Sequence, residues 1–144
     1  MLYSFLLWSI PVIVLLVGAE PTGALRVGVV GTEGMDDWGL EAVADGLERV
    51  YGERVHTRIL GERLDTAGFD YRLTERGIQL STVPFHDPEL VRHFRRASGT
   101  DIVIFVTQRD MSRWDRGDHP FLAGEADPRT GSVVVSTARV QGSW

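Results

Sequence analysis

The stretch from Thr100 to Thr107, TDIVIFVT, is apolar at almost every position. A strand with one face in water alternates apolar and polar residues, whereas a strand covered on both faces reads as a continuous apolar run. We therefore expect this stretch to be a central strand with structure packed on both faces. That requirement favours a layered α/β fold.

The segments around this strand are expected to form the other strands of the sheet and the helices that cover it. Residues 24–31 form an apolar run that ends in glycine, which predicts a second buried strand. Residues 37–51 and 88–98 carry apolar side chains at helical spacing, with an aspartate before each and a glycine after each. With extended segments at 54–60 and 132–140, the order predicts a twisted, mixed, mostly parallel sheet with two helices. Most of residues 61–85 and all of 108–131 are expected to be loop.

The N-terminal segment differs from the rest, because Leu2 to Ala19 contains no charged residue. Its length fits a membrane-anchoring helix, and the small residues up to Ala19 also fit a secretory signal peptide. Both alternatives place the remaining chain at the membrane or outside the cytoplasm. Residues 20–24 are expected to be a linker.

Composition excludes several classes of function. The net charge is −5, which argues against a nucleic-acid partner because such proteins need a basic surface. No cysteine is present, so the chain has neither disulfides nor thiolate metal ligands. Glu89 and His93 share a helix face, but two ligands are fewer than the three that a protein zinc site needs. We therefore predict no metal site and no cofactor in this chain.

The segment from residue 101 to residue 140 resembles the archaemetzincin family, zinc-dependent peptidases of the zincin superfamily. The upstream strands and helices follow the same order, so the resemblance extends from Leu25 to residue 144. Its markers near the end of the chain are Thr107, Asp110, Phe121, Gly124–Ala126, Ser136 and Arg139.

The resemblance implies that residues 25–144 form the N-terminal subdomain of a zincin fold. In the family, a catalytic helix with the motif H-E-x-x-H-x-x-G-x-x-H follows the last strand. This chain has no histidine after His119 and no His-Glu pair, so the zinc of complete members has no ligands here. The resemblance also implies that strand 132–140 is an edge strand. Its backbone would bind an extended peptide through the residues Val134, Val135, Ser136 and Thr137.

Three functional hypotheses follow. The first is a truncated, inactive homologue of an archaemetzincin-like metallopeptidase. The second is a non-catalytic peptide-binding module tethered to the membrane through residues 2–19. The third is one half of a split peptidase, which acts on a peptide or protein substrate when a catalytic half is supplied.

Overall fold

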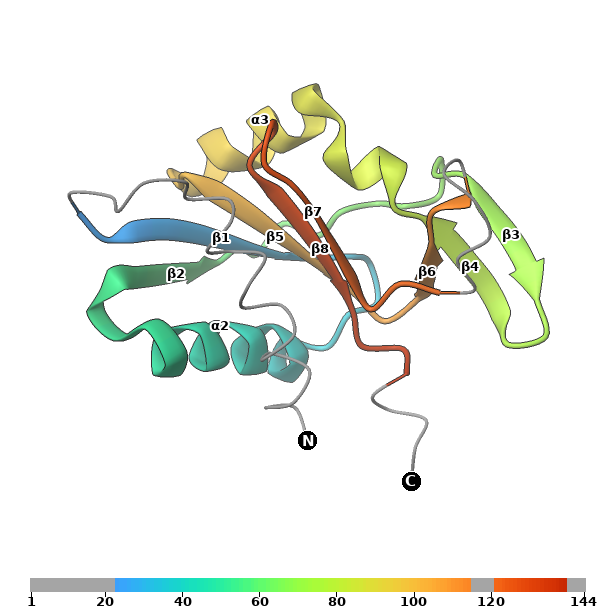
Figure 1. Ribbon diagram of the computed structural model, residues 1–144, viewed down its shortest axis with the longest axis horizontal. Helices are drawn as coiled ribbons and strands as arrows, with labels where there is room; N and C mark the ends of the chain where they lie inside the picture. Colours follow the sequence, from blue (N-terminus) through green and yellow to red (C-terminus); the bar gives the residue numbers. More distant parts are fainter. Residues whose placement is uncertain (1–22, 115–120, 140–144) are drawn as a thin grey trace.

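The computed structural model describes residues 23–114 and 121–139. Its main element is a five-stranded sheet in the order β2-β1-β5-β8-β7, and a second sheet has the order β3-β4-β6 (Figure 1). The elements in chain order are β1 (Leu25–Gly31), α2 (Asp37–Tyr51), the 3-10 turn η1 (Gly52–Arg54), β2 (Val55–Ile59), β3 (Tyr71–Thr74), β4 (Gly77–Ser81), the 3-10 turn η2 (Val83–His86), α3 (Pro88–Ser98), β5 (Ile102–Thr107), β6 (Asp110–Ser112), β7 (Gly124–Asp127) and β8 (Ser132–Ser136).

The predicted α/β class is confirmed, and β5 is the central strand. All six of its residues are buried, and it runs parallel to β1 on one side and to β8 on the other. β2 is also parallel to β1, and only β7 is antiparallel to its neighbour. The sheet is therefore mixed and mostly parallel, as the order of elements predicted.

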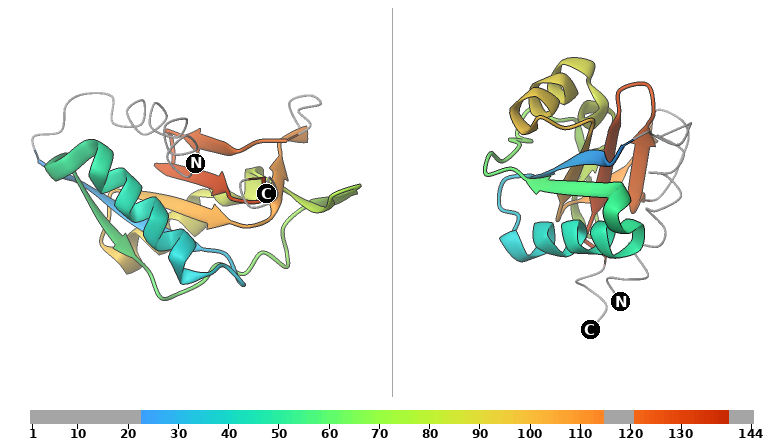
Figure 2. Two further views of the ribbon diagram at one scale, coloured as in Figure 1. Left: turned by 90° about the horizontal axis from the view of Figure 1, so that it is seen from below. Right: turned by 90° about the vertical axis from the view of Figure 1, so that its left-hand side faces the viewer.

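The two helices cover opposite faces of this sheet, as the end-on view in Figure 2 shows. Ile104 of β5 belongs to the core on the α2 side, whereas the next residue, Phe105, belongs to the core on the α3 side. This alternation follows from the two-residue period of a strand. It explains why the β5 sequence contains no polar interruption.

The two predicted helices occur where their boundary residues placed them. The carboxylate of Asp87 accepts hydrogen bonds from the backbone amides of Glu89 and Leu90, at 3.0 Å each, and so caps α3. Gly99 ends that helix at a φ of +66°, a conformation that favours glycine. Asp36 precedes α2, but its carboxylate accepts from the indole Nε1 of Trp38 instead of a helix amide.

The second sheet corrects the prediction that residues 61–85 and 108–131 are mostly loop. β3 and β4 form a tight hairpin, and β6 adds to β4 in parallel, at one end of the molecule in Figure 1. These short strands lack a clear apolar period because polar side chains pack between them. Arg72 Nε donates to Gln79 Oε1 at 2.5 Å, and Gln79 Nε2 donates to Asp110 Oδ2 at 3.1 Å. Sequence periodicity detects apolar faces and so misses strands that are held by buried polar bonds.

No helix in the described part of the chain is long and apolar enough to cross a membrane. Leu2–Ala19 lies outside the described residues, as does most of the predicted linker. The membrane anchor and the signal peptide therefore stay predictions.

Aromatic side chains fill the core between α3 and the sheet. The Phe105 ring is fully buried, and its centre lies 5.6 Å from that of Phe94 and 5.8 Å from that of Phe85. We expect Phe105→Ala to lower the free energy of unfolding by about 3–5 kcal/mol, because it leaves a cavity between close-packed layers. Chemical denaturation would measure this loss. As a control, Leu73→Ala in β3 should change stability little, since Leu73 is 77% exposed; equal losses would contradict this assignment of the core.

Candidate functional site

Strand β8 lies inside the sheet and not at its edge. It pairs with β5 in parallel and with β7 antiparallel. The amide of Ser136 donates to Ala123 O at 2.8 Å, and the amide of Thr137 donates to Thr107 O at 2.9 Å. The prediction that strand 132–140 is an edge strand is therefore wrong. The backbone of Val134, Val135, Ser136 and Thr137 is occupied within the protein.

The reason for this error is the polar sequence before β8. Gly124–Asp127 reads GEAD, which has no residue that favours strands, yet it forms the edge strand β7. The signal that was available is the turn that follows it: Asp127 and Gly131 close a hairpin, with the Gly131 amide donating to Asp127 O at 3.0 Å. A turn of this kind before a strand indicates a strand on its other side as well.

Strand β7 presents free backbone groups outward. In an antiparallel pair, residues alternate between those that bond to the partner and those whose amide and carbonyl point away. The bond from Ser136 to Ala123 sets this alternation, so Glu125 and Asp127 bond to β8. Gly124 and Ala126 therefore direct their amides and carbonyls away from the sheet. No described residue pairs with that side of β7.

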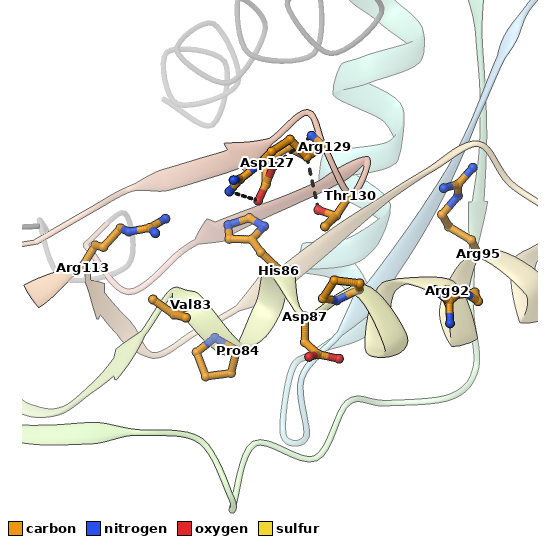
Figure 3. Close-up of a pocket in the computed structure, with 11 residues that line it drawn as sticks. Val83, Pro84, His86, Asp87, Arg92, Arg95, Arg113, Asp127, Arg129 and Thr130 are labelled. Carbon is orange, nitrogen blue, oxygen red and sulfur yellow. Dashed lines mark hydrogen bonds and ion pairs between the residues drawn. The ribbon is translucent and has the colours of Figure 1, made fainter. Parts of the chain in front are cut away.

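A cluster of polar side chains supports β7 from the α3 side. Glu125 Oε1 lies 2.8 Å from an Arg113 guanidinium nitrogen and 3.1 Å from His86 Nε2. His86 Nδ1 shares a hydrogen bond of 2.7 Å with Ser132 Oγ of β8. The cluster thus joins β7, β8, η2 and the segment after β6. Figure 3 shows His86 and Arg113 in this region.

The carboxyl group of Glu125 has a lowered pKa. Burial is the largest single influence and acts to raise the pKa, but the donors of His86 and Thr82 and the charge of Arg113 together outweigh it. His86 Nε2 and Thr82 Oγ1 are both buried and act on this carboxylate without forming an aligned hydrogen bond among the described residues. Arg113, His86 and Thr82 are therefore arranged around the negative charge of the Glu125 carboxylate.

The markers of the archaemetzincin resemblance meet near the end of β8. The Arg139 guanidinium forms two hydrogen bonds to the Asp110 carboxylate, at 3.1 and 3.2 Å, and lies 3.6 Å above the Phe121 ring. Ser136 Oγ donates to Arg109 O at 2.6 Å. These contacts tie the chain after β8 to the second sheet. Residues that lie far apart along the sequence are thus neighbours in space.

The residues described here do not fit a catalytic zinc ion. Across 23–114 and 121–139, no group of three or more His, Cys, Asp and Glu side chains is placed to hold a metal. His93 Nε2 lies 3.0 Å from Glu62 Oε1, on the exposed surface, so these two residues form a surface hydrogen bond rather than a site. Glu89 shares the helix face with His93 but adds no third ligand.

Comparison with solved structures shows which fold this chain shares. The chain superposes on the crystal structure of archaemetzincin from Methanopyrus kandleri with a TM-score of 0.58, over 85% of this chain. The chain has the archaemetzincin fold. The sequence identity is 19%, and the match spans 63% of the length of that protein. No protein-family model and no curated protein matches the sequence. The resemblance that the sequence suggested is therefore confirmed as a shared fold.

The pKa of Glu125 has a consequence for stability. Because its pKa is lower in the folded chain, the carboxylate stabilises the fold above its unfolded pKa of about 4.3, and this contribution is lost as pH falls through the folded value. We expect Glu125→Gln to lower the free energy of unfolding at pH 7 by about 1–3 kcal/mol, since Arg113 loses its buried partner. The deficit should shrink at acid pH, where the native carboxylate is itself protonated. Denaturant unfolding from pH 7 to pH 3 would measure it. Glu75→Gln in the exposed β3–β4 turn is the control, and a pH-independent deficit for Glu125→Gln would contradict this account.

Proposed function

We propose that this chain binds extended peptides along the outer edge of β7, as the substrate-holding part of an archaemetzincin-like metallopeptidase. The observation that carries this proposal is the outward direction of the Gly124 and Ala126 backbone groups at the sheet edge. An extended peptide pairs with such an edge by β-augmentation, in which main-chain hydrogen bonds supply the affinity. The proposed peptide-binding site is therefore on β7, whereas the sequence predicted it on the neighbouring strand β8.

The support cluster beneath β7 suits this role. A strand that receives a peptide must hold its own shape, because an edge that is ordered before binding loses less entropy on association. Glu125 and Asp127 bond to β8 through their backbones, while their side chains bond to Arg113 and Arg129. Both the backbone and the side chains of this short strand are therefore held before a peptide arrives.

The fold comparison supports the class of protein rather than the reaction. Archaemetzincin is the named protein whose fold this chain shares, and a shared fold does not by itself imply a shared activity. Because the described residues do not fit zinc, we assign no hydrolytic step to them. In this proposal, peptide hydrolysis requires a zinc-binding part that another polypeptide supplies.

The alternative is a peptide-binding module that acts without hydrolysis and is tethered through Leu2–Ala19. Its binding edge is the same, and the two functions differ only in the fate of the bound peptide. Zinc-dependent cleavage of that peptide in the presence of a polypeptide with an H-E-x-x-H motif would favour the split peptidase.

The proposal is tested by removing one outward amide. Ala126→Pro deletes an amide that points away from β8, so it removes no bond of the β7–β8 pair. We expect it to weaken binding of extended peptides about three- to tenfold, which corresponds to the loss of one hydrogen bond. Binding would be followed by fluorescence anisotropy with a library of labelled, end-blocked hexapeptides, and the amides of Gly124 and Ala126 by hydrogen exchange.

Strand β3 offers a matched control. The Ser81 amide donates to Asp70 O at 2.9 Å, so by the same alternation Leu73 directs its amide away from β4 at a second exposed edge. Leu73→Pro should leave peptide binding unchanged. If no peptide protects the Gly124 and Ala126 amides, or if Leu73→Pro weakens binding as much as Ala126→Pro, the β7 edge is not the peptide site.

A further inference from the structure

A cavity of about 680 Å³ opens on the α3 side of the molecule. Its walls are α3, the turn η2, Arg113, and the turn that joins β7 to β8 together with the last residue of β7, Asp127, as Figure 3 shows. Four arginines and two aspartates line it: Arg92, Arg95, Arg113, Arg129, Asp87 and Asp127. An excess of basic groups in one cavity is notable in a chain with a net charge of −5.

Both aspartates in the wall are already satisfied within the protein. The Asp127 carboxylate accepts from the Arg129 guanidinium at 3.0 and 3.1 Å. That pairing lowers the pKa of Asp127, chiefly through the side-chain hydrogen bonds, so the carboxylate is charged at neutral pH. The Asp87 carboxylate caps α3. Asp127 is therefore paired with Arg129, whereas Asp87 keeps its negative charge, because the backbone amides that it accepts from are neutral.

Of the four arginines that line the cavity, Arg92 and Arg95 remain to be considered. Neither forms a hydrogen bond or an ion pair with a described residue, and Arg95 acts only at a distance on the charge of Asp101. They stand three positions apart on α3, so they lie on one side of the helix. Arg113 is already engaged with Glu125. Two guanidinium groups that have no hydrogen-bond or ion-pair partner within 23–114 and 121–139 thus line one cavity.

His86 also lines the cavity, but both of its ring nitrogens face residues of the protein. It is only 7% exposed, its Nε2 atom lies 3.1 Å from Glu125 Oε1, and its Nδ1 atom lies 2.7 Å from Ser132 Oγ. The arginines are therefore the groups that a ligand in the cavity would meet. The α3 N-terminus itself supplies no amide, because Pro88 has none and the next two amides bond to Asp87.

We propose that this cavity binds a phosphate group, with Arg92 and Arg95 as its principal ligands. A phosphate monoester carries a charge of about −1.5 to −2 at neutral pH, so two guanidinium groups attract it more strongly than they attract a carboxylate. The planar fork of arginine also fits phosphate oxygens in pairs. The group is carried either by a soluble phosphate ester or by a lipid headgroup. This site is separate from the β7 edge and does not depend on peptide binding.

The test uses the full chain and inorganic phosphate at constant ionic strength. Isothermal calorimetry should detect saturable binding, and Arg92→Gln combined with Arg95→Gln should weaken it at least about tenfold, since both charge-assisted contacts are lost. Arg96→Gln is the matched control, because Arg96 is exposed on the same helix but does not line this cavity. The control should change binding less than about twofold, the scale of a screened surface charge. Absence of saturable binding by the native chain, or an equal loss in the Arg96→Gln variant, would overturn the proposal.

Vesicles identify the source of the phosphate group. Flotation with phosphatidylcholine vesicles, with and without phosphatidic acid, isolates the part of association that depends on the phosphate headgroup. Loss of that part in the double variant supports the site and assigns it to a lipid. Phosphate binding with headgroup-dependent association equal in the native chain and the double variant supports the site and assigns it to a soluble ester.

Discussion

Burial of β5 on both faces is the constraint on which the rest of the structure depends. Ile102, Ile104 and Val106 face the α2 layer, while Val103 and Phe105 face the α3 layer. A strand with apolar side chains on both faces is stable only when each face is covered, because exposed apolar area costs free energy in water. The two helices must therefore lie on opposite sides. β1 is parallel to β2 and to β5, since the crossovers through α2 and α3 return the chain in the same direction. β8 is also parallel to β5, but the chain between these two strands passes through β6 and β7.

Polar contacts decide how the chain is arranged at the C-terminal end of this sheet. Asp110 accepts from both Arg139 and Gln79, and Gln79 accepts in turn from Arg72. This chain of bonds connects β3, β4 and β6 to the segment after β8. Burying such groups is costly unless each finds a partner, so the network allows few alternative arrangements. It gives the smaller sheet a defined position without a large apolar core of its own.

The two proposed binding features use different kinds of recognition. The edge of β7 offers backbone groups, which any extended peptide can pair with, and its selectivity must come from neighbouring side chains. The cavity beside α3 offers guanidinium groups, which select for charge. The hairpin of β7 and β8 contributes to both, because β7 forms the edge and the turn at Arg129 forms one wall of the cavity. The edge follows from the position of β7 at the end of the sheet, whereas the cavity follows from arginines that this sequence places on α3.

The sequence by itself determined the elements whose signals are local. The continuous apolar run of β5, the periodicity of α2 and α3, and the aspartate and glycine at the ends of α3 each depend on a few adjacent residues. Asp110, Ser136 and Arg139, with the other markers and the order of the upstream strands and helices, also suggested the fold, although not the contacts of these residues. Only the tertiary structure decided which strand is the edge. GEAD carries no strand signal of its own and becomes β7 because β8 pairs with it, and this pairing is a property of two segments together. The arginines of the cavity are a second example. The sequence shows that Arg92, Arg95 and Arg129 are charged, but only the folded structure shows that their side chains line the same cavity.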